Sequence, residues 1–305
     1  MQADSRNLVH KKQSAVSSQQ SNPPIPPLAK GGEGGLLITL IDTHCHLEMG
    51  DFNPDREEVI KRAKDSGIEA IITIGSDLEG NVGGLKLSEK YNFIYSSVGF
   101  HPHDAKDFTE ELLDRLREWT GINPPIPPLE KGGKGGFERP KESKVVAIGE
   151  IGLDYHYDNS PREIQKHVFK RQLQYAKEIN LPVIIHSREA KKDTIDIIRE
   201  AGVNKGVLHC FSGDMEMAEK AMAMGFYISI AGPVTFKNAR RLRDIAKAIP
   251  DDYLLIETDA PYLTPEPFRG RRNEPSYIVH TAMAIAELRG ITLEDMARIT
   301  TINAK

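Results

Sequence analysis

The chain carries six side chains suited to metal binding, each placed at or just after the end of a predicted β-strand. His44 and His46 follow an apolar run, and both imidazoles point the same way because side chains alternate faces along a strand. Four further such side chains follow other apolar runs, namely Glu150, His186, His209 and Asp259. Four imidazoles and two carboxylates exceed the four ligands of a closed zinc site. The set therefore predicts two divalent metal ions.

Glu150 stands near the middle of this set, and a carboxylate can bridge two ions. A water held between two ions becomes acidic enough to act as a nucleophile at neutral pH. The pattern therefore favours a hydrolase that activates water with two metals. Imidazole-rich ligation suits Zn, whereas carboxylates and water suit Mg or Mn, so all three metals stay open.

Eight apolar runs, separated by helical or amphipathic stretches, must position these side chains. They span residues 36–41, 69–74, 93–98, 144–148, 181–185, 206–208, 226–230 and 253–256. Apolar strands that alternate with helices are typical of a parallel sheet, and eight units are the number of a closed (β/α)8 TIM barrel. A doubly wound open sheet is the alternative, but it places its site at one crevice. Candidate ligands at the ends of five strands favour the α/β barrel, which gathers all strand ends at one mouth.

Two Pro- and Gly-rich segments interrupt this pattern. Residues 22–36 recur as residues 123–137, with 12 of 15 positions identical. We interpret both copies as low-complexity insertions, with a proline-motif docking segment as the alternative. The expected organisation is a disordered tail over residues 1–35 and a barrel domain over residues 36–305, with an inserted surface loop at about 122–137.

The composition excludes several classes of protein. No apolar run approaches the roughly 20 residues of a membrane span. Two cysteines are too few for a disulfide framework, so we expect a cytoplasmic protein, and we take it to be a monomer. The net charge of -4 gives no general attraction to nucleic acid, so such binding needs a local basic patch. The basic cluster expected near the mouth is residues 268–273.

Five ordered segments carry a family resemblance. They are Asp42-Thr-His-Cys-His-Leu, Gly149-Glu-Ile-Gly-Leu-Asp-Tyr, Leu181-Pro-Val-Ile-Ile-His-Ser-Arg, His209-Cys-Phe-Ser-Gly and Glu257-Thr-Asp-Ala-Pro-Tyr-Leu. Together they closely resemble the TatD-like metal-dependent deoxyribonucleases, which are amidohydrolase-type TIM barrels. The resemblance spans about residues 38–305, interrupted by the second repeat. It implies a hydrolase that cuts phosphodiester bonds in DNA, typically as a 3′-to-5′ exonuclease on single strands.

The resemblance also implies which residues hold each metal. One ion goes to His44, His46, Glu150 and Asp259, and the other goes to Glu150, His186 and His209. Asp259 is expected to take the proton from the attacking water, which makes it a catalytic residue together with Glu150.

Four further residues are expected on the substrate side. His101 follows the third apolar run and is expected beside the substrate or behind a ligand. Arg188 is expected to hold a phosphate. Asp154 and Tyr155 follow Glu150 closely, and the sequence leaves open whether Tyr155 stacks on a base or packs.

Two other functions remain open from the residues alone. The same barrel and metals serve hydrolases of small esters, lactones or amides and aminoacyl-ester deacylases, since a fold does not fix a substrate. A metal-stabilised interaction module is the non-enzymatic alternative. A structural site needs no open coordination position, so the six-residue set speaks against it.

Overall fold

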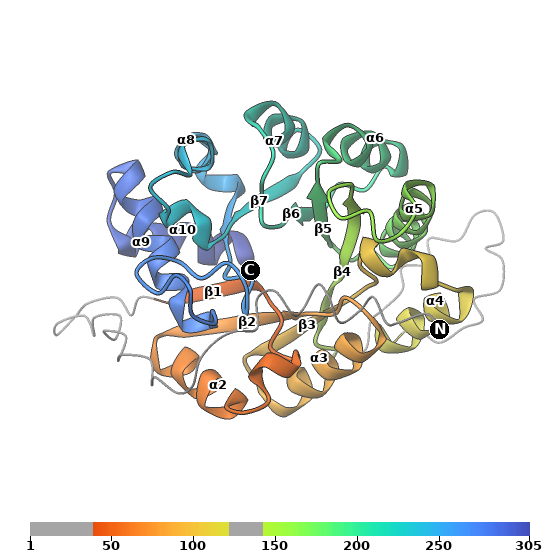
Figure 1. Cartoon of the computed structure of the whole chain (residues 1–305), viewed down its shortest axis with the longest axis horizontal. Coiled ribbons are helices and arrows are strands. Elements are labelled where there is room, and N and C mark those ends of the chain that lie inside the picture. Colours follow the sequence, from red (N-terminus) through yellow and green to blue (C-terminus); the bar gives the residue numbers. More distant parts are fainter. Residues whose placement is uncertain (1–38, 122–142) are drawn as a thin grey trace, which may run out of the picture.

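The computed structural model describes residues 39–121 and 143–305, in which eight parallel strands form a ring surrounded by helices (Figure 1). The strands follow chain order around the ring: β1 (Leu40–Cys45), β2 (Ile68–Ile74), β3 (Ile94–Val98), β4 (Val145–Asp154), β5 (Val183–Arg188), β6 (Gly206–Leu208), β7 (Phe226–Ile230) and β8 (Leu254–Ile256). The predicted TIM barrel is therefore confirmed. The predicted disordered tail over residues 1–35 and the surface loop at about 122–137 lie outside the described residues.

Helices cover the outside of the ring (Figure 1). The α-helices are α2 (Arg56–Asp65), α3 (Leu78–Lys90), α4 (Glu110–Trp119), α5 (Arg162–Glu178), α6 (Lys191–Ala201), α7 (Met215–Met222), α8 (Arg240–Ala248), α9 (Ile278–Arg289) and α10 (Leu293–Ala304). Short 3₁₀ helices are η1 (Gly50–Phe52), η2 (Pro102–Asp107), η3 (Gly232–Thr235), η4 (Asp251–Tyr253) and η5 (Pro275–Tyr277). No helix among the described residues combines the length and apolar character that crossing a membrane requires.

The ring closes between β1 and β8 through the residues that follow β8. Cys45 and Ala260 form a parallel bridge. The His46 N–H donates to the Ala260 carbonyl at 2.7 Å, and the Asp259 N–H donates to the His44 carbonyl at 2.8 Å. Candidate metal ligands thus lie on the seam between the first and last strands.

Alternation along the strands carries candidate site residues into the barrel. A small buried cluster includes Ile184 from β5, Val207 from β6 and Leu255 from β8, together with residues of β2 and β4, so it lies inside the ring. The residues two positions further along the chain are His186, His209 and Glu257. They share the inward face because side chains alternate with a period of two.

Three strands run further than the sequence predicts. β1 includes His44, β4 includes Glu150, and β5 includes His186, so the predicted ends at residues 41, 148 and 185 are wrong. Gly152 gives one reason, because its φ of +140° suits glycine and a Cβ there would lie 2.0 Å from the His186 carbonyl oxygen. The close approach of β4 to β5 extends the sheet to the mouth and holds these ligands on regular strands.

Candidate metal centre

Two groups of ligand atoms meet at the mouth of the barrel. The first consists of His44 Nε2, His46 Nε2, Glu150 Oε2 and Asp259 Oδ1. The two imidazole nitrogens are 3.3 Å apart. His44 Nε2 lies 3.5 Å from the Glu150 oxygen and 3.6 Å from the Asp259 oxygen. His46 Nε2 lies 3.8 Å and 3.6 Å from the same two oxygens.

These spacings fit one tetrahedrally ligated cation. Ligand atoms about 2.0–2.2 Å from a tetrahedral ion stand about 3.3–3.6 Å from one another. Five of the six edges of such a tetrahedron measure 3.3–3.8 Å here. The predicted first set of ligands is therefore brought together with dimensions suited to an ion.

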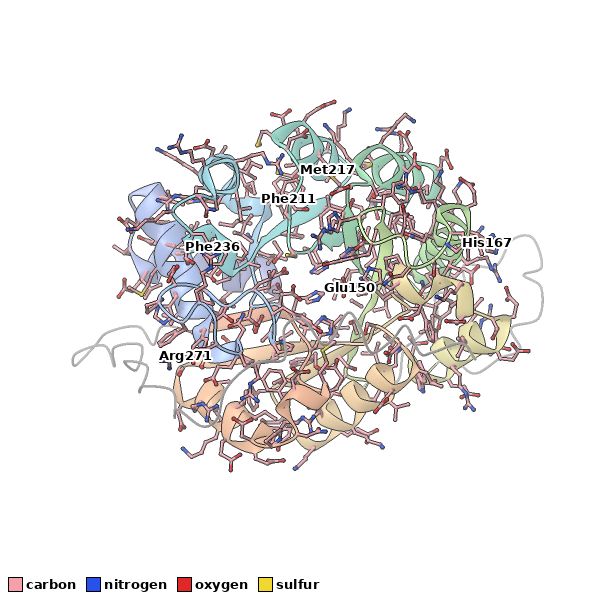
Figure 2. The ribbon with its side chains drawn as sticks, in the orientation of Figure 1. Glu150, His167, Phe211, Met217, Phe236 and Arg271 are labelled. Atoms are coloured by element: carbon pink, nitrogen blue, oxygen red, sulfur yellow. The ribbon has the colours of Figure 1, made fainter. Side chains whose placement is uncertain are left out.

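The second group shares Glu150 with the first. Glu150 Oε1 lies 2.9 Å from His186 Nδ1 and 2.7 Å from His209 Nε2, and these two nitrogens are 3.3 Å apart. Glu150 thus turns one oxygen toward each group, as a bridging carboxylate would, and it lies near the centre of the ring (Figure 2). Three protein atoms are the number that catalytic metal sites use while they keep one position open.

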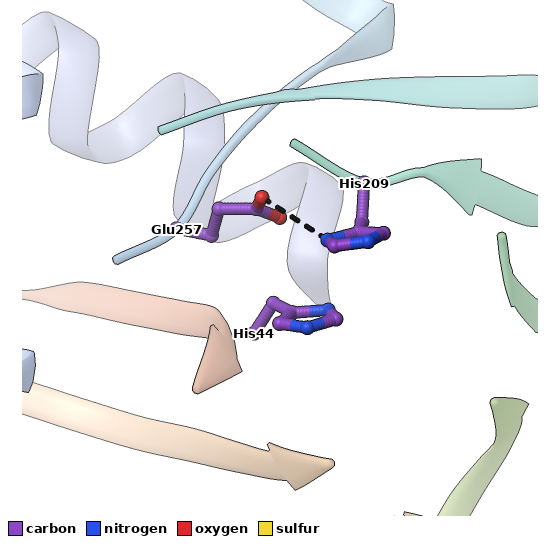
Figure 3. Close-up of side chains that lie close together, drawn as sticks. All are labelled: His44, His209 and Glu257. Carbon is purple, nitrogen blue, oxygen red and sulfur yellow. Dashed lines mark ion pairs between the residues drawn. The ribbon is translucent and has the colours of Figure 1, made fainter. Parts of the chain in front are cut away.

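Three of the four imidazoles have a carboxylate at the ring nitrogen that faces away from the centre. His186 Nε2 lies 3.0 Å from an Asp154 oxygen, His209 Nδ1 lies 3.5 Å from a Glu257 oxygen, and His46 Nδ1 lies 3.5 Å from a Glu48 oxygen. The His44 and His209 rings stack at 3.9 Å, with Glu257 beside them (Figure 3). A carboxylate at this position fixes the tautomer and orientation of a metal-binding imidazole and raises its basicity.

Sequence reasoning assigned no role to Glu48 or Glu257. The signal was present, because each stands two residues from a candidate ligand, His46 or Asp259. Asp154 was expected on the substrate side. Its side chain is only 1% exposed, and its Oδ2 lies 3.0 Å from His186 Nε2. Its position favours holding the imidazole over contacting a substrate.

The surroundings of Glu150 and Asp259 favour the ionised carboxylate, which is the form that binds a metal ion. Burial works to raise the pKa of Glu150, but the surrounding imidazoles, His209 first, outweigh it and hold the pKa well below its usual range. Burial likewise opposes ionisation of Asp259, yet hydrogen bonding to His46 and nearby imidazole charge lower its pKa. Burial and the neighbouring His209 lower the pKa of His44, which keeps that ring neutral and able to ligate.

His101 lies at the centre, but its hydrogen bonds favour a supporting role. Its Nδ1 accepts a hydrogen bond from the His103 N–H at 3.2 Å, so the ring proton sits on Nε2. Nε2 lies 3.4 Å from Glu150 Oε1 and can donate to it. Burial lowers the pKa of His101 to about 4, which keeps the ring neutral. A nitrogen that carries a proton cannot ligate a metal, so this geometry favours orientation of Glu150.

A buried carboxylate holds the two sides of the seam together. Asp42 Oδ1 accepts from the Thr258 N–H at 3.0 Å and from the His44 N–H at 3.3 Å, and Oδ2 accepts from the Thr258 hydroxyl at 2.6 Å. Asp259, the residue after Thr258, has a φ of +55°, a conformation that is uncommon outside glycine. These bonds fix the backbone on both sides of the candidate ligands.

The remaining predicted substrate residues differ in where they lie. The Arg188 guanidinium stacks 4.8 Å over the ring of Tyr157, which is 49% exposed. The Tyr155 hydroxyl donates to Asp193 at 2.7 Å, and the ring packs against the core. Between the two roles left open for Tyr155, this placement favours packing. Tyr157 and Tyr262 are the exposed aromatic residues beside the centre, and Tyr262 contacts the His46 ring edge-on.

Comparison with known proteins gives consistent matches. Residues 41–305 match the family described as TatD related DNase. The chain is 48% identical over 268 residues to the uncharacterized metal-dependent hydrolase YabD of Bacillus subtilis, covering 87% of this chain and 97% of that protein. It is 34% identical to the 3′-5′ ssDNA/RNA exonuclease TatD of Erwinia amylovora, with 87% and 98% covered.

A solved structure shows the same architecture. The crystal structure of YJJV, a TatD homolog from Escherichia coli, superposes with a TM-score of 0.76 at 30% identity and covers 88% of this chain and 97% of that one. The fold and the family resemblance predicted from the sequence are thereby confirmed. The chain belongs to the TatD-related DNase family of metal-dependent hydrolases.

Proposed function

We propose that this chain removes nucleotides from the 3′ end of single-stranded DNA by hydrolysing phosphodiester bonds with two divalent ions. The observation that carries the proposal is Glu150, whose two oxygens face separate groups of ligand atoms. When bound, two ions supply an acidified water and positive charge beside both the attacking and the leaving oxygen of a phosphodiester. The name of the Erwinia relative supports this class of substrate.

The chain's own residues take complementary roles. The Asp259 side chain is 13% exposed and its pKa is lowered, so it stands as a base that can accept a proton from water at the mouth. Arg188 makes no ion pair with any described residue and is held over Tyr157, so its guanidinium is available for a phosphate. His101, Asp154 and Glu257 hold the ligands in place.

The test is cleavage of single-stranded DNA labelled at the 3′ or the 5′ end. Chelator-stripped wild type, Glu150→Gln and Glu163→Gln would each receive Mg, Mn or Zn separately. Glu163 is 86% exposed, so its variant is a control for the same chemical change. We expect early release of the 3′ label and a ladder from the 5′-labelled strand. Glu150→Gln should lose more than about 100-fold of this activity because both groups lose a charged ligand.

Other outcomes would contradict the direction of cleavage, the nuclease activity or the two-metal centre. A ladder from the 3′-labelled strand would reverse the assigned direction. If wild type cleaves no DNA with any of the three metals, the nuclease proposal fails, and the same samples should go to lactones and aryl esters. Metal analysis should find two ions per wild-type chain, and one ion would contradict the shared role of Glu150.

A further inference from the structure

A basic surface lies on the segment from Lys237 to Arg243 and on Arg269 in the loop after β8. It contains five cationic side chains, at positions 237, 240, 241, 243 and 269. The exposed acidic side chains in and beside these stretches are Asp244 and Glu266, whereas Glu257, Asp259 and Glu274 of the same loop are not exposed. This excess of positive charge contrasts with the net charge of -4 of the whole chain.

The cations of this surface have few acidic partners. Among the described residues, the side chains of Lys237, Arg240 and Arg243 take part in no hydrogen bond or ion pair, and Lys237 and Arg240 are exposed. Elsewhere the described cations are commonly paired, as in Lys191 with Asp214 at 2.8 Å. Unpaired like charges repel one another, so a cluster of them favours an anionic partner.

The predicted basic cluster at residues 268–273 is largely occupied within the fold. Arg272 donates to Asp55 at 2.7 Å and to the Asp51 carbonyl at 2.6 Å, and its guanidinium covers the Phe52 ring. In contrast, Arg269 is exposed, its guanidinium lies 4.3 Å from the centre of the Phe236 ring, and it makes no hydrogen bond or ion pair with a described residue. From that predicted cluster, Arg269 therefore contributes free positive charge, and Lys237, Arg240 and Arg243 contribute the rest.

This surface is built on the rim of the mouth. Residues 231–239 follow the C-terminal end of β7, and in a barrel these ends form the active-site face. The Glu266 N–H donates to Thr235 Oγ1 at 2.9 Å, which ties the loops after β7 and β8 together. Arg241 donates to the Ser212 carbonyl, after β6, at 2.9 Å. Phe236 lies on the α8 side of the ring and Glu150 nearer its centre (Figure 2).

We propose that Lys237, Arg240 and Arg269 form a track for the backbone phosphates of a single-stranded nucleic acid, upstream of the nucleotide that is cleaved. The inference rests on the proposed nuclease function, which it extends with a second contact region. Phosphates complement this charge, and flexible cations bind them without regard to base sequence. Arg243, three residues after Arg240 on the same helix face, extends the track.

The test compares a triple variant with a matched control. The track variant is Lys237→Gln, Arg240→Gln and Arg269→Gln. The control is Arg117→Gln, Arg199→Gln and Lys220→Gln, which removes the same charges from the last turns of α4, α6 and α7. These turns lie at the opposite end of the barrel, because the helices run antiparallel to the strands.

Binding is measured without cleavage, on the metal-loaded full chain. The probe is a fluorescent oligothymidylate of about 15 nucleotides with phosphorothioate linkages, titrated at several salt concentrations. Each neutralised phosphate contributes about 0.7 to the slope of log K against log salt, so loss of three contacts reduces that slope by about 2. Raising salt from roughly 50 to 200 mM then costs wild type about 18-fold more affinity than the track variant.

Cleavage kinetics distinguish the track from the catalytic centre. For a long oligonucleotide, the track variant should raise KM with kcat unchanged, and for a dinucleotide it should change neither. An unchanged salt slope in the track variant, or an equal change in the control, would overturn the proposal. So would equal weakening of polyglutamate binding, which would show a general anion surface. Oligonucleotide binding without cleavage would refute the nuclease function and leave the track standing.

Discussion

Substitution of Asp42 tests whether the seam positions the candidate ligands. Asp42 is fully buried, and its carboxylate accepts three hydrogen bonds, two of them from Thr258. Asp42→Ala removes every acceptor, whereas Asp42→Asn keeps the shape and one acceptor oxygen. The two variants therefore separate the loss of the hydrogen bonds from the loss of the charge.

The expected magnitudes follow from the groups left without partners. In Asp42→Ala, the buried N–H and hydroxyl of Thr258, which make the two shorter bonds, lose their acceptor at about 1–3 kcal/mol each, for a total of about 2–6 kcal/mol before the longer bond from His44 is counted. In Asp42→Asn, Oδ1 still accepts from the backbone, and the Thr258 hydroxyl can accept from the new amide. Burial raises the pKa of Asp42 to about 7, so the neutral amide also avoids a buried charge. We expect Asp42→Asn to cost about 1 kcal/mol or less.

The sign of the pH dependence also follows. The folded pKa of about 7 lies above the ordinary value of 3.8, so the folded state holds a proton that the unfolded state releases. This contribution is complete below the unfolded pKa and is lost as pH rises through the folded pKa. Asp42→Asn cannot titrate, so wild type should lose stability relative to Asp42→Asn between about pH 4 and pH 7, and the small initial gap should close and then reverse.

Urea unfolding followed by circular dichroism measures both effects, on chelated protein and again with metal. Asp42→Ala should also weaken metal binding, because His44 and Asp259 lose a shared support. If the two variants destabilise equally, hydrogen-bond geometry is not the cause. If Asp42→Ala costs less than about 1 kcal/mol, the seam does not depend on this carboxylate.

Three further predictions concern the centre and its surroundings. Measured by calorimetry, Glu257→Gln should weaken metal binding roughly 10-fold and Glu257→Ala roughly 100-fold, because His209 loses its orienting partner. A metal affinity equal to that of wild type in both variants would show that the contact is unimportant. Chelation should lower Tm and added metal should raise it in proportion to the logarithm of free metal; a Tm independent of metal would contradict an ion at the seam. Burial lowers the pKa of His280 below 6.5, so the folded state loses stability as pH falls through 6.5. His280→Phe should lessen this loss relative to wild type, and identical pH profiles would refute the assignment.

The convergence of the ligands was predictable from the sequence because it depends on simple periodicity. Strand alternation and the rule that barrel sites lie at strand ends were enough to place His186 and His209 together. The length of β4 was not predictable, because it depends on Gly152 lying against the His186 carbonyl, a contact between segments far apart in the sequence.

Roles that depend on a distant partner were likewise hidden. Asp154 and Tyr155 stand beside each other in the sequence, yet one lies under His186 and the other binds Asp193 on α6. The free cations show the same limit. A list of arginines gives no indication that Arg272 is paired with Asp55 while Arg240 is not.

The position of the seam links metal exchange to opening of the barrel wall. β1 and β8 are joined by one bridge and a few backbone bonds, whereas β2 and β3 share a regular ladder. An ion held by His44 and His46 on one side and Asp259 on the other would act as a clasp across this join. Separation of the strands and release of that ion then become one event. The residence time of the metal and the amide hydrogen exchange of His46 and Asp259 should therefore share a single rate.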